Sequence, residues 1–303
     1  MNALSILHPV LALALAPLLL GVINRVKAFF AGRTGQPLLQ AYFDLLRLCR
    51  KGAVYSSTTS WVFRAGPVIG LASVLVALAV VPFGGVAAPL HFTGDLLLLA
   101  YALGLMRFFT VAAALDTGSA FEGMGASREV QFSALAEPSL LLGLAAIAFK
   151  TGSTSLSGML PGVSPGIWAQ EGPAMSMVAI AMLAILLAEN SRIPVDDPNT
   201  HLELTMIHEV MVLDHSGPDF GIILYSAALK LWAMSALLVG LVVPVHTGNP
   251  WLDVPAALAG TMLLAVVIGV IESVMARLRL LRVPQLLVGA GAISVIALIL
   301  VLR

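Results

Sequence analysis

Charged residues are scarce in this sequence. Only 11% of its 303 residues are Asp, Glu, Lys or Arg, and 59% are hydrophobic. Soluble domains carry about 25% charged residues, because a soluble protein must present a polar surface to water. The deficit excludes a soluble enzyme and predicts that lipid surrounds most of the chain.

Cysteine and net charge are also in short supply. Cys49 is the one cysteine, which excludes a disulfide framework and any iron–sulfur cluster held by four cysteines of this chain. Basic and acidic residues number 16 each, so no net basic charge indicates nucleic acid. No basic region precedes the first apolar run, which predicts an uncleaved first span rather than a signal peptide.

Long apolar runs dominate what is present. A transmembrane helix needs about 20 mostly apolar residues. The sequence predicts a single all-α polytopic membrane domain over 1–303. Its eight or so expected spans lie at about 3–23, 65–84, 95–115, 133–150, 174–189, 221–244, 254–276 and 284–302.

The basic residues predict the orientation of these spans. Twelve of the 16 Lys and Arg residues fall in loops that follow odd-numbered spans. Because such loops stay in the cytoplasm, both termini are predicted outside a cell (inner or plasma) membrane. The cytoplasmic loops expected at 24–64, 116–132 and 190–220 are long and polar. We therefore expect partner docking and any chemistry on that side.

One segment of the first loop has the periodicity of an amphipathic helix. From Pro37 to Lys51, apolar residues recur at the i, i+3, i+4, i+7 spacing of one helix face, and Gln40 and Asp44 lie on the opposite face. This pattern predicts an interfacial helix that walls a site at the membrane surface; the alternative is a plain loop helix. Cys49 falls on the apolar face, so we expect a buried thiol.

Several charged residues interrupt the apolar runs. Arg107 and Lys230 lie within predicted spans, Glu137 begins the fourth span, Glu189 ends the fifth, and Glu272 lies near the end of the seventh. Charge inside a bilayer is costly and marks function by default. A series of buried carboxylates and bases that titrate near neutral pH is what a proton relay requires. The alternative is that each charge forms a structural pair.

The third loop is rich in glycine and acidic residues. Gly118, Gly123 and Gly125 are expected to allow tight backbone turns there. The segment lacks a preceding strand and a P-loop lysine, so a phosphate cradle is a poor interpretation.

The fifth loop contains three histidines spaced by seven residues. Pro194 and Pro198 break the preceding helix, and a helical pattern resumes from Asn199, so His201, His208 and His215 share a face if one helix runs through. Seven residues span about 10 Å of helix, which is too far for a compact metal site. We predict no metal site, and the surrounding acidic residues indicate a surface for a partner protein or a proton entry.

Three stretches carry a family resemblance. They are DTGSAFEGMGASRE from Asp116 to Glu129, the pair Glu137–Pro138, and AENSRIPVD from Ala188 to Asp196. The chain resembles the subunit 1 family of respiratory complex I, in the branch found in hydrogenase-4, formate hydrogenlyase and other group 4 energy-converting hydrogenases. The resemblance covers essentially the whole chain.

The resemblance implies a non-catalytic subunit at the joint between a membrane arm and a peripheral redox arm. Hydrogenase-like large and small subunits are expected on the cytoplasmic side, with antiporter-like subunits in the membrane. The iron–sulfur clusters and the Ni–Fe centre are expected in those partners, and no cofactor in this chain. The expected proton relay comprises Glu137, Glu189, Glu203, Asp196, Arg107 and Lys230. The expected junction cavity and docking surface comprise Asp116, Arg128, Glu129, Arg192, Asp197, His201, His208, Glu209 and Asp214.

One departure from the family pattern leaves the quinone open. Complex I carries several glutamates after the aspartate of the third stretch, whereas two of those positions here are Asn199 and His201, and Glu203 remains. The alternatives are a quinone-site subunit of a complex I-like dehydrogenase, a stand-alone secondary transporter and a purely structural anchor. A transporter often shows internal repeats, and no convincing repeat relates 1–150 to 151–303.

Overall fold

The computed structural model describes residues 3–196, 207–244 and 247–303. The regular elements in this part of the chain are all helices. They are η1 (Ala3–Ile6), α1 (Leu7–Phe30), α2 (Gln40–Cys49), α3 (Trp61–Val80), α4 (Asp95–Asp116), α5 (Ala120–Thr151), α6 (Leu156–Gly162), α7 (Pro165–Glu189), η2 (Val210–Val212), α8 (Gly217–Val242), α9 (Pro250–Val274), η3 (Leu280–Arg282) and α10 (Val283–Val301).

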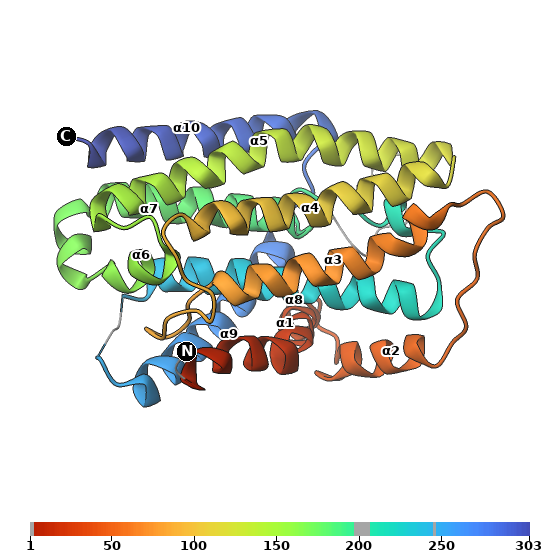
Figure 1. The fold of residues 1–303 in the computed structure, drawn as a ribbon, viewed down its shortest axis with the longest axis horizontal. Coiled ribbons are helices and arrows are strands. Elements are labelled where there is room, and N and C mark those ends of the chain that lie inside the picture. The colour runs from red at the N-terminus through yellow and green to blue at the C-terminus, as the bar shows by residue number, and fades with distance from the viewer. Residues whose placement is uncertain (1–2, 197–206, 245–246) are drawn as a thin grey trace.

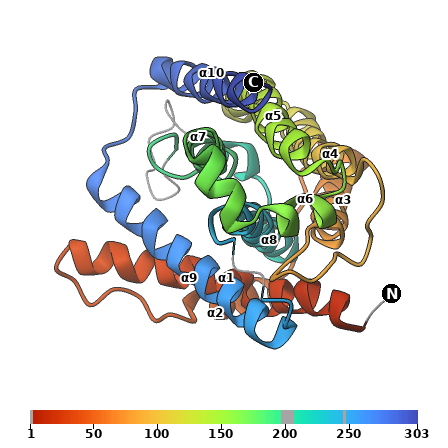
Figure 2. The same ribbon diagram turned by 90° about the vertical axis from the view of Figure 1, so that its left-hand side faces the viewer.

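The described chain has eight helices that are long and apolar enough to cross a membrane. This confirms the predicted all-α membrane fold. Helices α3, α4, α5, α8 and α10 run side by side along the long axis of the molecule, and both chain ends lie toward the same end of it (Figure 1). Helix α1 crosses them at a steep slant, and α7 and α8 occupy the middle of the end-on view (Figure 2).

Helix α8 forms the centre of the bundle. It packs against α1, α3, α7 and α9, and every residue from Ala228 to Val239 is buried. Neighbouring helices rather than lipid therefore cover this stretch. Lys230, the one charged residue in this buried stretch, is thereby forced to find its partners inside the protein.

Helix α5 begins much earlier than the sequence predicts. It starts at Ala120, so the predicted loop 116–132 shrinks to a short turn in which Gly118 adopts a φ of +71°. Gly123 and Gly125 are helical, which corrects their assignment to turns. A Cβ on Gly125 would lie 2.8 Å from the backbone carbonyl oxygen of Ile207. The glycine therefore lets the fifth loop pack against α5, a tertiary contact that composition does not reveal.

The predicted helix through the fifth loop is wrong in its described part. Between residues 207 and 216 the regular structure is limited to the three-residue turn η2. Side chains tether the backbone instead: Asp196 Oδ2 accepts from the N–H of Ile207 at 3.1 Å, and Glu122 Oε1 accepts from the N–H of Asp214 at 3.1 Å. The predicted residues Asp197, His201 and Glu203 lie outside the described residues.

The start of α2 is fixed against α1. The Tyr42 hydroxyl donates to the backbone carbonyl of Ala14 at 2.5 Å. A Cβ on Gly21 would lie only 2.0 Å from the carbonyl oxygen of Leu38, so the chain entering α2 presses directly on the α1 backbone. The predicted amphipathic helix within 37–51 is confirmed as a helix, and its position relative to the bilayer stays a prediction.

This contact predicts a large difference between two glycine substitutions. Gly21→Ala should destabilise the folded chain by about 1–3 kcal/mol, the usual cost of overpacking. Gly289→Ala is the control, because a Cβ at that position in α10 meets nothing within 4 Å. Thermal unfolding of the detergent-solubilised chain measures both variants. Equal stability of the two would contradict the packing of α2 on α1.

Candidate functional site

Arg107 of α4 lies at the centre of a buried group of charged side chains. Its Nε donates to Glu129 Oε1 at 3.1 Å, and its Nη2 donates to both carboxylate oxygens of Glu189 at 2.6 and 2.5 Å. Its Nη1 pairs with Glu137. The fork of guanidinium donors suits several carboxylates at once. One arginine, 8% exposed, therefore joins α4, α5 and the end of α7.

Lys230 of α8 adds a second cation. Its Nζ lies 2.8 Å from Glu189 Oε2 and donates to the backbone carbonyl of Glu189 at 2.7 Å. The second contact satisfies one of the carbonyls that a helix leaves unpaired at its C-terminal end. We call Arg107, Glu129, Glu137, Glu189 and Lys230 the ion cluster. Its two cations face three carboxylates, so when all are ionised it has one excess negative charge.

His208 can supply the missing positive charge. Its Nε2 lies 3.2 Å from Glu129 Oε2. Burial lowers the pKa of His208, but the charge and hydrogen bond of the Glu129 carboxylate, together with the charge of Asp196, raise it further, so the pKa lies above its ordinary value of 6.5. Asp196 Oδ2 accepts from the backbone N–H of His208 at 3.3 Å and fixes its position. Protonated His208 therefore balances the excess negative charge of the ion cluster, and loss of its proton leaves that charge unbalanced.

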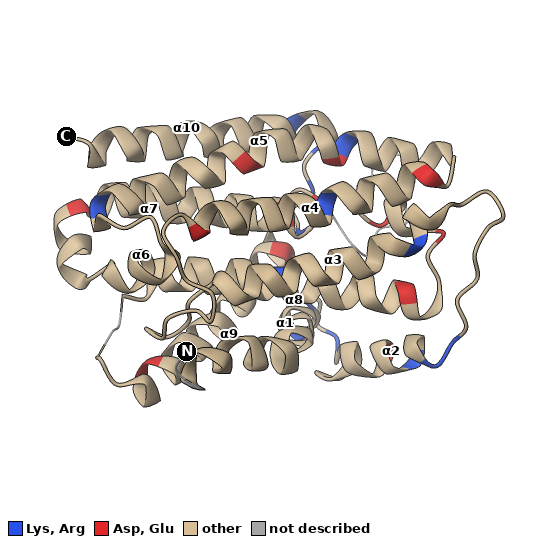
Figure 3. Ribbon diagram, in the orientation of Figure 1, with Lys and Arg blue, Asp and Glu red and all other residues tan. Residues whose placement is uncertain are grey.

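A second set of ion pairs adjoins the first. Glu272 of α9 bridges Lys27 of α1, with Oε2 2.8 Å from Nζ, and Arg192, with Oε1 3.4 Å from Nη1. Asp196 pairs through Oδ1 with Arg277 Nη2 at 2.9 Å. Asp196 thus connects the segment that follows α9 to the segment that carries His208. Figure 3 shows that charged residues are more frequent toward the end of the bundle near α2 than at the opposite end.

A cavity of about 430 Å³, which we call the main cavity, borders the ion cluster. Its charged end includes Arg107, Glu129, Lys230, Arg192 and His208. Its apolar wall includes Pro17, Leu20, Phe220, Leu224 and Leu231. Ligand pockets usually measure about 300–1,000 Å³, so the main cavity can admit a small organic molecule or a group of waters.

Three buried polar atoms belong to residues that line this cavity. Asn190 Oδ1, Arg192 Nε and His208 Nδ1 have no hydrogen-bond partner among the described residues. Buried polar groups in folded proteins are almost always hydrogen-bonded. The charged end of the main cavity is therefore suited to water or to the polar group of an occupant.

Helix α2 walls the main cavity with its more polar face. Gln40, Ala41, Asp44 and Leu45 line the cavity, whereas apolar residues such as Leu46 are exposed, 58% in this case. The prediction that this helix walls a site is consistent with that arrangement. The prediction of a buried Cys49 thiol is wrong, because Cys49 is exposed. The residues of α2 that line the cavity are half-buried, and Cys49 is not one of them.

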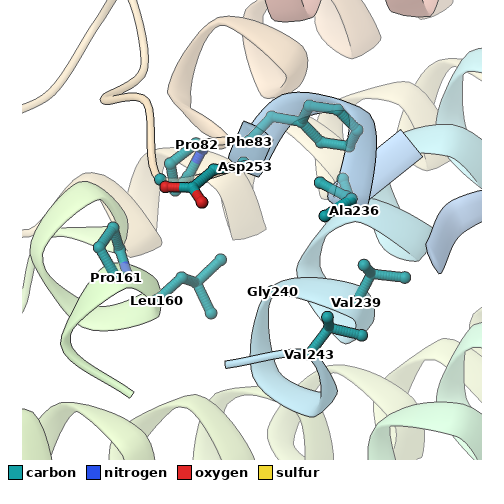
Figure 4. A pocket seen from close by; sticks show the side chains of 13 residues that line it. Pro82, Phe83, Leu160, Pro161, Ala236, Val239, Gly240, Val243 and Asp253 are labelled. Atoms are coloured by element: carbon teal, nitrogen blue, oxygen red, sulfur yellow. The ribbon is translucent and has the colours of Figure 1, made fainter. Parts of the chain in front are cut away.

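A much smaller cavity of about 20 Å³ lies at the opposite end of the bundle (Figure 4). Its walls are mainly apolar, and its one charged residue, Asp253, accepts from the backbone N–H and the hydroxyl of Thr247 at 3.0 and 2.8 Å. The space is about that of one water molecule. It has neither the size nor the convergent polar groups of the main cavity.

The structure brings four of the predicted relay residues into direct contact. Glu137, Glu189, Arg107 and Lys230 are all in the ion cluster, and Asp196 is one contact away through His208.

The predicted docking residues are more dispersed. Glu129, Arg192, His208 and Glu209 line the main cavity. Arg128 is partly exposed and Asp214 exposed, both outside the cavity lining. Asp116 instead holds the start of α3, because its Oδ2 accepts from the backbone N–H of Ser60 at 2.7 Å.

Sequence reasoning left several site residues out of the predicted set. Gln40, Asp44 and Asn190 line the main cavity, and Glu272 with Lys27 forms the adjoining ion pair. Glu272 did stand out as a carboxylate in an apolar run. A partner for it could have been sought in Lys27, a basic residue just beyond the first predicted span.

Two subunits of hydrogenase complexes are similar to this chain over most of its length. Formate hydrogenlyase subunit 4 of Escherichia coli (strain K12) is 32% identical over 299 residues, which cover 93% of this chain and 94% of the relative. Hydrogenase-4 component C of the same organism is 30% identical over 240 residues, 79% of this chain and 75% of the relative.

A solved structure shows the same fold. A chain of the membrane-bound sulfane sulfur reductase, an archaeal respiratory membrane complex, is 20% identical, with a TM-score of 0.81 over 98% of both chains. Residues 2–302 match the family model described as NADH dehydrogenase. The chain therefore belongs to the NADH dehydrogenase family.

Proposed function

We propose that this chain is the membrane-anchoring and proton-coupling junction subunit of an oxidoreductase complex of the hydrogenase-4 or formate hydrogenlyase type. The observation that carries the proposal is the buried ion cluster beside the main cavity. The similarity of the chain to subunits of hydrogenase and respiratory membrane complexes supports a place in a larger assembly. The chain has a single cysteine, so electrons are expected to stay on iron–sulfur clusters and a Ni–Fe centre in partner subunits.

Charge balance is the basis of the proposed coupling. The ion cluster holds one more carboxylate than cations, and His208 contacts it through Glu129. A change of charge at the end of the main cavity alters the energy of each ionised carboxylate, because Coulomb interactions are strong in a poorly solvated interior. A redox change in a docked partner can thus be converted into uptake or release of a proton.

Glu137 is the proposed exit from this chain. It lies near the middle of the 32-residue helix α5, and its side chain is 44% exposed although it pairs with Arg107. A carboxylate at bilayer depth is costly next to lipid. We therefore propose that a further membrane subunit, of the antiporter-like kind, covers this face of α4 and α5 and receives the proton.

The remaining partners follow from the predicted orientation. Hydrogenase-like large and small subunits would dock on the cytoplasmic loops, which include α2 and the segment around His208. Both termini would then lie outside the cell membrane.

A quinone-site subunit is the second candidate function. The main cavity combines an apolar wall with a charged end, the combination that an amphipathic molecule with a polar head group requires. Under our first proposal, a quinone analogue leaves the redox turnover of the intact complex unchanged. Competitive inhibition by the analogue would instead establish the second function.

Neutral replacement of the relay carboxylates tests the coupling. Glu137→Gln should leave assembly and redox turnover intact and abolish proton movement in membrane vesicles. Glu189→Gln should also uncouple but lower the assembled amount, because a buried cation that loses its partner costs about 3–5 kcal/mol.

Glu171→Gln is the matched control for both carboxylate variants. Glu171 lies in the first part of α7, whereas Glu189 ends that helix. Its Oε1 lies 2.7 Å from Lys150 Nζ, and its side chain is partly exposed. The Glu171→Gln variant should keep normal proton movement. If both Glu137→Gln and Glu189→Gln also keep it, the proposed relay is wrong.

The raised pKa of His208 implies that the stability of the folded chain decreases as the pH rises. Its pKa in the folded chain lies above 6.5, so its ionic contribution is fully present below pH 6.5 and is lost as the pH rises through the raised pKa. The thermal stability of the wild-type chain should therefore fall as the pH rises above about 6.5. His208→Gln should flatten the fall, whereas the exposed His91→Gln should not. An unchanged slope in His208→Gln would contradict the assignment.

A further inference from the structure

His215 is a nearly buried histidine that the proposed relay does not use. It is 7% exposed, and its ring stacks on Phe63 with 3.9 Å between the ring centroids. Its Nδ1 is buried without a hydrogen-bond partner in the described part of the chain. A buried polar atom of this kind normally has a partner, so its surroundings need an account.

A small cavity of about 20 Å³ lies beside this ring, between α3, α4 and α8. We call it the side chamber. Its lining includes Met106, Thr110, Val212, His215, Ile223 and Ser226. Its volume is about that of one water molecule, which typically needs two to four polar partners.

Three polar groups of the lining can serve that water. The hydroxyls of Thr110 and Ser226 donate to the backbone carbonyls of Met106 and Ile222 at 3.0 and 2.7 Å. Because each hydroxyl uses its proton in that way, each oxygen remains able to accept. Together with His215 Nδ1, they provide the hydrogen bonds that one water requires.

The side chamber adjoins the main cavity. Met106, Thr110, Val212 and Ile223 line both spaces. Thr110 lies one helical turn beyond Arg107 on α4 and presents the hydroxyl of this shared wall. A proton that reaches Thr110 is therefore at the border of the space that contains Glu129.

The other side of His215 adjoins the loop surface. Asp214 and Asp219 are its charged neighbours, and Asp219 Oδ2 accepts from the Tyr55 hydroxyl at 2.8 Å. Burial lowers the pKa of His215 to about 4, against the opposing effect of the two carboxylates. The ring is thus neutral at physiological pH, with one nitrogen able to accept a proton while the other donates.

We propose that the side chamber binds one ordered water and that His215, this water and Thr110 form a proton inlet from the loop surface to the main cavity. One ring nitrogen of His215 takes up a proton while Nδ1 releases one to the water. The water passes a proton to the hydroxyl oxygen of Thr110, and the hydroxyl turns its own proton away from the Met106 carbonyl and releases it into the main cavity. Protons balance at every step, and no electron moves. The inference rests on the proposed proton-coupling function.

The test compares proton uptake with redox turnover in vesicles that contain the whole complex. His215→Phe keeps the ring stack on Phe63 and should slow proton uptake about a hundredfold, the lower end of what a positioned proton-transfer group contributes. Thr110→Val should have a similar effect, and Thr110→Ser should restore the rate. His91→Phe, an exposed histidine outside the site, should behave as wild type.

The outcomes separate this inference from the proposed function. Normal uptake in His215→Phe and Thr110→Val, with uptake lost in Glu137→Gln, would overturn the inlet and leave the relay standing. Normal uptake in all three would overturn both. A high-resolution cryo-EM map of the complex gives an independent readout: density for a water bonded to His215 Nδ1 supports the inlet, and a dry chamber contradicts it.

Discussion

The pairing of Arg107 with three carboxylates is the constraint on which the rest of the site depends. A guanidinium buried among apolar helices cannot lose its partners without a large cost, so α4, α5 and the end of α7 must meet around it. Lys230 then closes the group from α8, the most enclosed helix of the bundle. The same contacts that hold these helices together leave one carboxylate in excess. That excess is the feature that makes a structural cluster responsive to protonation.

The ion cluster and the main cavity are two sides of one arrangement. Glu129 contacts Arg107 on one side and His208 on the other, and His208 is held by Asp196 in a segment that follows no regular helix. Side chains, rather than a helix, hold this segment beside the main cavity. At the other end, the half-exposed Glu137 places an ionisable group on the outer face of the bundle.

Much of this arrangement could be predicted from the sequence because charge in an apolar run is conspicuous. Arg107, Lys230, Glu137 and Glu189 stood out individually, and the structure brings all four together. The early start of α5 and the irregular segment around η2 could not be predicted in the same way. Both depend on tertiary contacts, such as the close approach of Ile207 to Gly125 and the bonds of Asp196 and Glu122 to backbone amides. Likewise, the exposed position of Cys49 depends on which face of α2 meets the cavity.

We propose that this chain works only as the proton-coupling joint of a larger redox complex. The most direct measurement is to tag the C-terminus, solubilise membranes in a mild detergent and identify the co-purifying proteins by mass spectrometry. We expect a hydrogenase-like large subunit, a small iron–sulfur subunit and antiporter-like membrane subunits to co-purify. Recovery of the chain alone, stable and monodisperse, would contradict it.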